Sequence, residues 1–305
     1  MSFTIKILGN NAAVPAHGRN QTSQLIILHN QFILFDCGEN TQHTLIRQKV
    51  NFNKIHHICI SHLHGDHYYG LMGLISTMQL FGRQKELNIY APAILHEILQ
   101  LHLKASDSRL NFSINFVPLD HPPKSALVEH KHFSIFAFPL THRIVCNGFL
   151  IREREKPFRL IKEKLPPKMK LQHIATLLKG ENVVDEAGEI IYQNSAYTMP
   201  PKKSRSYAYC SDTVFDQNII PIVKGVDVLY HESTFLDEME ERAKDTFHST
   251  ASQAATIAKK AHVKKLLLGH YSTRYKELSP FLEEARRIFP NSFLSLEGED
   301  INIEE

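Results

Sequence analysis

The pattern that decides the fold is Ser61-His62-Leu63-His64-Gly65-Asp66-His67, which places three imidazoles and one carboxylate within six residues. Imidazole nitrogens and carboxylate oxygens are ligands that zinc and other borderline metals prefer. The spacing H-x-H-x-D-H is much more specific than a pair of histidines, so a histidine-rich surface loop is the weaker interpretation. The stretch therefore predicts a metal site.

The flanking residues place this cluster in a loop between a strand and a helix. Residues 55–60 form an apolar run typical of a buried strand, and residues 71–81 carry apolar side chains at helical spacing. Alternate side chains of an extended loop point to opposite sides, so His62 and His64 can face one ion. Asp66 and His67 can then face a second ion.

Length and composition indicate a globular protein. The 305 residues can bury the core of one large α/β domain or two ordinary ones, and 43% of them are hydrophobic. We find no apolar run of about eighteen residues and no export signal. Four cysteines without C-x-x-C spacing favour reduced thiols, so we expect a cytoplasmic protein without a membrane partner. The net charge of +3 does not by itself indicate nucleic acid.

Four further apolar strands are each followed by side chains that can bind metal or move a proton. The predicted strands at 133–138, 207–210, 227–230 and 265–268 lead to His142, Asp212, His231-Glu232 and His270, respectively. In layered α/β folds, ligands and metals gather at the carboxyl ends of strands. One strand-end histidine is usually structural, but several beside the 62–67 cluster indicate one shared site.

Two smaller features complete the prediction around the site. Asp36 follows a predicted strand at 31–35, and its carboxylate either bonds nearby backbone or orients a ligand histidine. Residues 249–261 predict an amphipathic helix with alanines for close packing, and Ser249 is expected to be its N-cap.

The segment between the predicted strands near 148 and 205 has a different composition. Residues 152–170 hold eight Lys/Arg and three Glu, a local charge of +5. A short helix at 171–178 and a small hairpin at 180–192 are predicted next. We interpret residues 150–203 as a basic arm, inserted into a single domain of residues 1–305, that meets a polyanion. A solvated insertion with ordinary surface charge is the alternative.

These motifs, in this order, resemble the short form of the ribonuclease Z family, the tRNA 3′-processing endoribonucleases of the metallo-β-lactamase superfamily. The motifs that carry the resemblance are Leu8-Gly9 to Pro15, Arg19-Asn20, the 62–67 cluster, His142, Ser211-Asp212-Thr213, His231 to Thr234, Phe247-His248-Ser249-Thr250 and Gly269 to Tyr275. His248-Ser249-Thr250 and the run from His270 to Tyr275 are more specific than the superfamily cluster, because other branches lack them.

The resemblance implies a four-layer αβ/βα sandwich, two zinc ions per subunit and usually a homodimer. In this family, the arm of one subunit holds the tRNA that is bound to the other. By the same resemblance, His62, His64 and His142 bind one zinc, Asp66, His67 and His270 bind the other, and Asp212 bridges them.

The implied reaction removes 3′ trailers from precursor tRNA by attack of a hydroxide that bridges the two ions. Asp66 is the expected general base and His248 the expected general acid, with Glu232 holding the tautomer of His248. The expected products are a tRNA 3′-hydroxyl and a trailer 5′-phosphate.

The sequence departs from the family pattern at two places. The family loop Pro-x-Lys-x-Arg-Asn has His17 in place of the lysine, and the usual Gly-Pro motif of the arm is missing near Lys168 to Leu171. Another two-zinc hydrolase of the same fold, such as a cyclic-nucleotide phosphodiesterase or an arylsulfatase, therefore stays an alternative. A non-catalytic RNA-binding protein is the weaker one, because all seven ligands are present.

Overall fold

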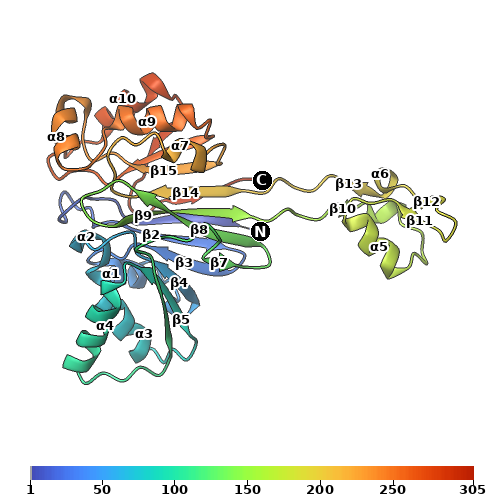
Figure 1. The fold of residues 1–305 in the computed structure, drawn as a ribbon, viewed down its shortest axis with the longest axis horizontal. Coiled ribbons are helices and arrows are strands. Elements are labelled where there is room, and N and C mark those ends of the chain that lie inside the picture. Colours follow the sequence, from blue (N-terminus) through green and yellow to red (C-terminus); the bar gives the residue numbers. More distant parts are fainter. Residues whose placement is uncertain (1) are drawn as a thin grey trace.

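Two seven-stranded β-sheets pack face to face in the computed structural model, which describes residues 2–305 (Figure 1). The first sheet has the order β18 (Asp300–Asn302), β1 (Phe3–Gly9), β2 (Ser23–Leu28), β3 (Gln31–Phe35), β4 (Ile55–Cys59), β5 (Leu87–Ala91) and β6 (Ile114–Pro118). The second has the order β17 (Ser292–Leu294), β16 (Lys265–Gly269), β15 (Val228–Glu232), β14 (Ser206–Cys210), β9 (Cys146–Glu153), β8 (Phe133–Leu140) and β7 (Val128–Glu129).

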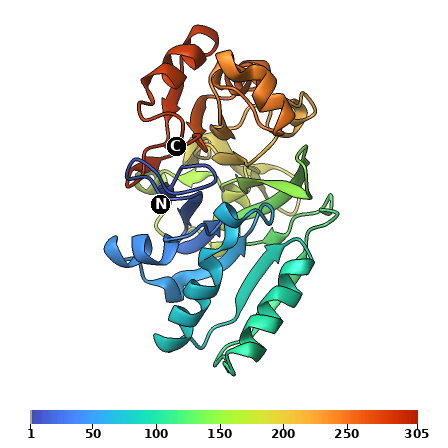
Figure 2. The same cartoon turned by 90° about the vertical axis from the view of Figure 1, so that its left-hand side faces the viewer.

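Helices cover the outer face of each sheet, as the view from the end opposite the arm shows (Figure 2). The first sheet carries α1 (Thr41–Arg47), α2 (Gly65–Tyr68), α3 (Gly70–Leu80), α4 (Ile94–Ala105) and the short 3₁₀ helix η1 (Phe52–Lys54). The second carries α7 (Ile219–Ile222), η3 (Asp237–Met239), α8 (Glu240–Asp245), α9 (Ala251–Lys260) and α10 (Ser279–Ile288). The expected four-layer αβ/βα sandwich is therefore confirmed.

Three apolar clusters hold the four layers together. Between the sheets, aromatic rings interlock, with the ring centroid of Phe35 lying 5.0 Å from that of Phe149 and 5.5 Å from that of Tyr209. A second cluster joins the first sheet to α1, α3 and α4. A third packs α9 and α10 on the second sheet, where the buried alanines of α9 allow close approach.

Strand direction brings the predicted site residues to one edge of the sandwich. Strands β3 to β6 run parallel to one another, and so do β14 to β17. Their carboxyl ends therefore meet at a common edge, where the loops after β4, β8, β14 and β16 deliver polar side chains. In residues 2–305, no helix is long and apolar enough to cross a membrane.

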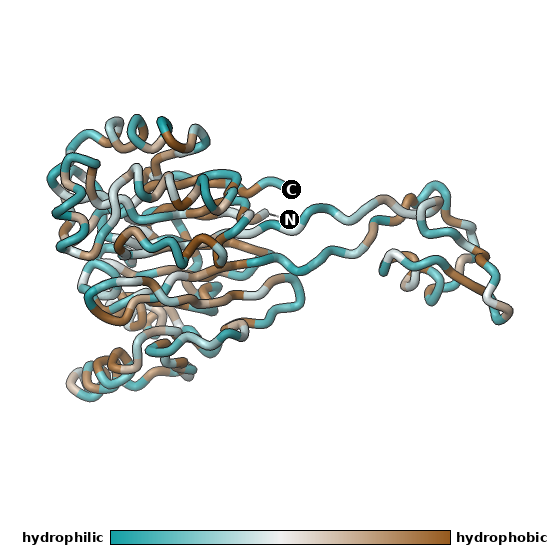
Figure 3. The backbone as a smooth tube through the Cα atoms, turned by 45° about the horizontal axis from the view of Figure 1, so that its top comes forward, coloured by the Kyte–Doolittle hydropathy of each residue, from teal (hydrophilic) through white to brown (hydrophobic). Residues whose placement is uncertain are grey.

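A basic arm projects from the opposite edge of the sandwich (Figure 1). It contains β10 (Arg159–Leu160), η2 (Lys162–Lys164), α5 (Leu171–Leu178), β11 (Val183–Val184), β12 (Ile190–Tyr192), α6 (Asn194–Tyr197) and β13 (Thr198–Met199). The two chain segments that connect it to the body are mostly hydrophilic (Figure 3). Strand β9 continues through the expected boundary at 150 and ends at Glu153, because residues 149–152 pair with β14.

The predicted N-cap of α9 is wrong. The helix begins at Ala251, and Thr250 caps it by accepting a hydrogen bond from the backbone of Gln253, whose side chain bonds back to Thr250. This reciprocal capping box satisfies two helix-terminal donors. The Ser249 hydroxyl instead donates to the carbonyl of Thr213, at 2.8 Å, which ties the start of the helix to the loop after β14.

Candidate metal centre

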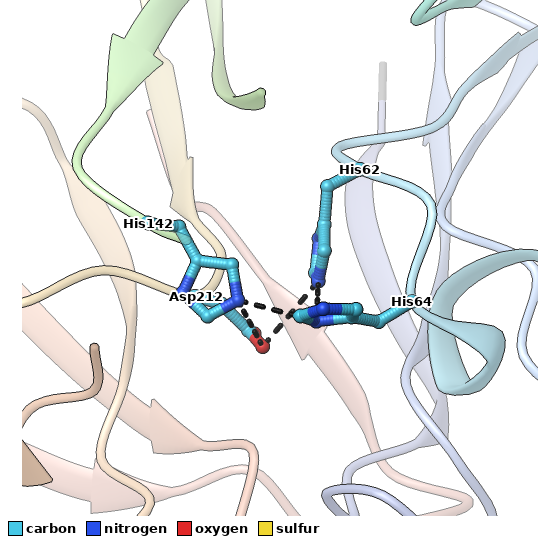
Figure 4. Close-up of side chains that lie close together, drawn as sticks. All are labelled: His62, His64, His142 and Asp212. Carbon is cyan, nitrogen blue, oxygen red and sulfur yellow. Dashed lines mark hydrogen bonds and ion pairs between the residues drawn. The ribbon is translucent and has the colours of Figure 1, made fainter. Parts of the chain in front are cut away.

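The structure brings all seven predicted metal ligands together in one cluster, of which His64 and His142 are partly buried and the other five buried. His62, His64, His142 and Asp212 form the first donor group (Figure 4). The Nδ1 atom of His64 lies 3.1 Å from Nε2 of His62 and 3.2 Å from Nε2 of His142. Ring nitrogens that converge at this distance form a cage for a cation, as tetrahedral zinc requires.

The second donor group lies on the other side of Asp212. The Nε2 atoms of His67 and His270 are 3.2 Å apart, and Oδ2 of Asp66 lies 3.5 Å and 3.4 Å from them. His67 comes from the start of α2 and His270 from the end of β16. Residues more than two hundred positions apart therefore share one site.

Asp212 faces both groups with different oxygens. Its Oδ2 lies 3.5 Å from Nε2 of His62 and 3.9 Å from Nε2 of His142. Its Oδ1 lies 3.4 Å and 3.2 Å from the Nε2 atoms of His67 and His270. One carboxylate is thus positioned between two donor groups, which is the arrangement that a bridging ligand needs.

Asp36 orients two ligand histidines of the first sheet. It accepts hydrogen bonds from Nδ1 of His67, at 2.8 Å, and from the hydroxyl of Ser61, at 2.9 Å. Because that hydroxyl donates to Asp36, its oxygen can accept from Nδ1 of His62, 3.0 Å away. Both rings then present Nε2 to the cluster. Asp36 also accepts from the backbone amide of Ser61, at 2.7 Å, so both of its predicted roles apply.

Glu232 performs the corresponding task in the second sheet. Thr234 donates its hydroxyl to Glu232 at 2.8 Å, and the same oxygen accepts from Nδ1 of His270 at 2.9 Å. Glu232 also accepts from Nδ1 of His248, at 2.9 Å. The carboxylate is held in turn by three backbone amides, of Thr213, Thr234 and Ser249. Glu232 therefore fixes the orientation of both histidines.

Burial and charge set the protonation of these groups. Burial lowers the pKa of His62, His64 and His142, which keeps these rings neutral, the form that binds metal. Burial also acts on His248, but the carboxylate of Glu232 outweighs it and raises the pKa to about 9. At neutral pH, His248 therefore carries a proton on each ring nitrogen.

Several groups that line the site had not been predicted. The carbonyl of Phe247 accepts from Nδ1 of His142 at 2.9 Å, and the amide of Ala13 donates to Oδ2 of Asp66 at 2.7 Å. Backbone groups give no residue-type signal, since nearly every residue has them. Arg242 and Arg274 help to line a cavity of about 370 Å³ at the metal centre. Of these two, only Arg274 lies within a recognisable motif.

Comparison with known proteins identifies the family. The family described as beta-lactamase superfamily domain matches residues 167–271, and the one described as anti-Pycsar protein Apyc1 matches residues 3–154. A ribonuclease Z from Cytophaga hutchinsonii is 46% identical, covering 100% of this chain and 97% of the relative. One from Parabacteroides distasonis is 42% identical, covering 99% of each chain. The chain belongs to the ribonuclease Z family.

Solved structures agree with this membership of the ribonuclease Z family. The short form of human tRNase Z superposes with a TM-score of 0.70 at 25% identity, covering 99% of this chain and 100% of that one. The metallo-beta-lactamase fold protein YhfI from Bacillus subtilis has the same TM-score at 17% identity, covering 99% and 100% of the two chains. At that identity the likeness to YhfI concerns the fold alone.

The residue that departs from the ribonuclease Z loop pattern lies beside the site. His17 has a φ of 55°, and its Nε2 lies 2.9 Å from the carbonyl of Thr273, in the loop after His270. The neighbouring Arg19 donates to the carbonyls of Tyr275 and Lys276. The loop of residues 15–20 is therefore fastened to the loop that follows β16.

Proposed function

We propose that this chain is a zinc-dependent endoribonuclease that removes 3′ trailers from precursor tRNA, leaving a tRNA 3′-hydroxyl and a trailer 5′-phosphate. The observation that carries the proposal is the pair of donor groups that share Asp212 beside an open cavity. Relatives of nearly the same length are named ribonuclease Z, and the similar human structure is a tRNase Z.

The donor set fits two zinc ions per subunit. Tetrahedral Zn–N bonds of ~2.0–2.1 Å place neighbouring donors ~3.3 Å apart, close to the 3.1 Å and 3.2 Å between ring nitrogens in the first group. Hydrogen bonds on the far nitrogens already fix the rings. We assign one ion to His62, His64 and His142, the other to Asp66, His67 and His270, and Asp212 to both.

When bound, the ions lower the pKa of water toward ~7 and offset negative charge on the phosphoryl oxygens. Asp66 is assigned as the general base. Its contacts with Ala13, His67 and His270 are all made by Oδ2. The other oxygen, Oδ1, is the one we assign to receive the proton of the attacking water.

His248 is assigned as the general acid. The ribose 3′-oxygen leaves poorly until it is protonated, so a positioned acid is needed when the P–O bond breaks. Glu232 holds Nδ1 of His248, at 2.9 Å, which leaves Nε2–H to donate the proton. Glu232 acts through His248 and is therefore a positioning residue. Arg242 and Arg274 are assigned to the RNA phosphates, which their charge attracts.

The arm is proposed to bind precursor tRNA outside the cleavage site. Residues 152–170 carry a local charge of +5, and lysine and arginine release counterions when they contact phosphates. The arm projects from the edge opposite the metal centre (Figure 1), so within one subunit it does not cover the site. This position supports a role in binding RNA rather than in the bond-breaking step.

A homodimer in the cytoplasm is the proposed working form. The helical layer on the first sheet leaves several large apolar side chains exposed. A soluble monomer rarely exposes so many on one layer. These side chains are Ile46, Tyr69, Leu80, Phe81, Ile94 and Leu101. The four cysteines are buried and unpaired, which suits a reducing compartment.

The test combines metal analysis with a cleavage assay. We expect two zinc ions per subunit and release of a 5′-phosphorylated trailer from precursor tRNA, with Asp212→Ala as the inactive control. No more than one ion per subunit under replete conditions would contradict the paired site. Cleavage of small phosphodiesters without cleavage of precursor tRNA would favour another two-zinc hydrolase. RNA binding without any hydrolysis would favour a non-catalytic protein.

A further inference from the structure

A cavity of about 700 Å³ lies beside His248 and is separate from the cavity at the metal centre. Its lining includes Phe215, Phe247, His248, Glu240, Glu241 and Asp245. Its volume is within the range of sites for small molecules. We propose that this cavity binds the base of the nucleotide on the 5′ side of the cut, the one that keeps the new 3′-hydroxyl. The inference rests on the proposed function.

The position of His248 selects this nucleotide. His248 lines both the 700 Å³ cavity and the smaller cavity at the metal centre. As the general acid, it must reach the ribose 3′-oxygen, which belongs to the nucleotide on the 5′ side of the cut. The ribose then lies against His248, and the base on that ribose points away from the ions toward the cavity.

Two aromatic side chains give the cavity a surface on which a base can stack. Phe215 and Phe247 both line it and both are partly buried. The backbone of Phe247 has a φ of 60°, an unfavourable value for a phenylalanine. Its carbonyl accepts from His142 at 2.9 Å, so the metal centre holds Phe247 in place. The backbone of Phe247 is therefore held beside His142.

The charge of the cavity distinguishes a base from a phosphate. Three carboxylates line it together with two cations, Lys244 and the protonated His248, which leaves a net negative charge. The cavity at the metal centre instead has two arginines, Arg242 and Arg274, beside Asp66 and Asp212. Glu240 already accepts a hydrogen bond from Gln253, at 3.0 Å. Glu241 and Asp245 can accept from exocyclic amino groups, which adenine, guanine and cytosine have and uracil lacks. The net negative charge of the cavity disfavours the RNA backbone, and its free carboxylates favour an amino-bearing base.

The first experiment pairs Phe215→Ala with substrates that lack one base. Precursor tRNAs with an abasic site 5′ or 3′ of the cut are compared with the intact RNA, by affinity and by single-turnover rate. Base–aromatic stacking predicts a loss of about tenfold for the 5′ abasic RNA and little for the 3′ one. Phe215→Ala should lower the affinity or the single-turnover rate on intact RNA by a similar factor. On the 5′ abasic RNA the same substitution should cause no further loss. Phe293→Ala, on β17, is the matched control.

Independent effects of Phe215→Ala and the 5′ abasic site, or a loss confined to the 3′ abasic RNA, would overturn the inference while leaving the proposed function intact. If the unaltered protein cleaved none of the RNAs, both the inference and the proposed function would be overturned.

A second measurement compares cytidine with uridine at the position 5′ of the cut. The unaltered protein should prefer cytidine, and Glu241→Gln combined with Asp245→Asn should abolish that preference. If the unaltered and the substituted protein preferred cytidine over uridine to the same degree, or neither preferred it, the role of the carboxylates would be contradicted.

Discussion

At the scale of single residues, His248 is the side chain that tests the proposed proton transfer separately from metal binding. It lies outside the seven assigned ligands, so His248→Ala should keep two zinc ions per subunit. Because the ribose leaving group then goes unprotonated, single-turnover cleavage of precursor tRNA should fall by about 10²–10⁴-fold. Metal analysis of the same preparation is the control. Unchanged cleavage would remove His248 from the mechanism.

Asp36 provides a second test at this scale, because it orients His67 directly and His62 through Ser61. Asp36→Asn should lower zinc affinity by about 10–100-fold, measured by competition with a chelator. Asp227, a buried carboxylate that accepts from the backbone and hydroxyl of Ser206, offers a matched control. If Asp227→Asn lowered zinc affinity equally, the effect of Asp36→Asn would come from a general loss of protein stability and not from the orientation of the histidines.

The convergence of the seven side chains could be predicted from the sequence, because strand-end positions in a parallel sheet meet at one edge. The hydrogen bonds that hold these seven side chains in place could not be predicted. Thr234 links Glu232 to His270 only because the loop after β15 folds back on β16. The carbonyl of Phe247 and the amide of Ala13 depend on loop conformations that no residue type announces.

At the scale of elements, a buried ion pair fastens the root of the arm to the body. The guanidinium of Arg205 donates two hydrogen bonds to Glu153, at 2.6 Å and 2.9 Å, and the backbone amide of Arg205 donates a third, at 2.9 Å. Burial alone would raise the pKa of Glu153, but the hydrogen bonds from Arg205 and Lys156 lower it to about 2. The carboxylate is therefore charged in the folded protein well below its ordinary pKa of 4.5.

This pair predicts a pH-dependent contribution to stability. A carboxyl group whose pKa is depressed by folding stabilises the fold at any pH above the pKa that it has in the unfolded chain. For Glu153 this contribution is lost as the pH falls from about 4.5 toward 2. Glu153→Gln should lower the free energy of unfolding by about 3 kcal/mol at pH 7. The difference from the unaltered protein should shrink as the pH falls below 5. Denaturant titrations at several pH values measure it, and a constant difference would contradict the assignment.

The arm can be removed at this root. The Nζ of Lys156 donates to the carbonyl of Lys203 at 3.1 Å, so the two segments lie within the reach of one lysine side chain. A Gly-Ser linker of several residues can therefore replace residues 157–202. The shortened protein should bind precursor tRNA more weakly and show a smaller salt dependence, because phosphate contacts are lost. Hydrolysis of bis(p-nitrophenyl) phosphate should be unchanged. Equal loss on both substrates would mean that the arm has a structural role.

Local sequence patterns predicted whether a segment forms a helix or a strand, but they did not predict the residues at which it begins and ends. The short helix and hairpin of the arm were predicted and are present as α5 and the β11–β12 pair. The start of α9 was misplaced by one residue, because Ser249 and Thr250 are both good caps. Only Thr250 has Gln at the third position that follows, which completes the capping box.

At the scale of the whole molecule, the proposed dimer depends on the helical layer of the first sheet. Leu101 on α4 is 68% exposed, so Leu101→Glu should leave the melting temperature nearly unchanged. If α4 lies in the dimer contact, the buried charge should shift the protein from dimer to monomer, as measured by light scattering. Leu296→Glu, in the second half of the chain, is the control. A dimer that tolerates both substitutions would use another surface.

The placement of the arm between neighbouring strands has an evolutionary consequence. Arg152 of β9 already pairs with Ser206 of β14, so the sandwich closes without any residue of the arm. Doubling the length of such a loop costs only about 0.6 kcal/mol in closure entropy. Descendants of this scaffold are therefore free to lengthen, trim or exchange the whole appendage, and so change what it contacts, while the metal-site side chains at the far edge are inherited intact.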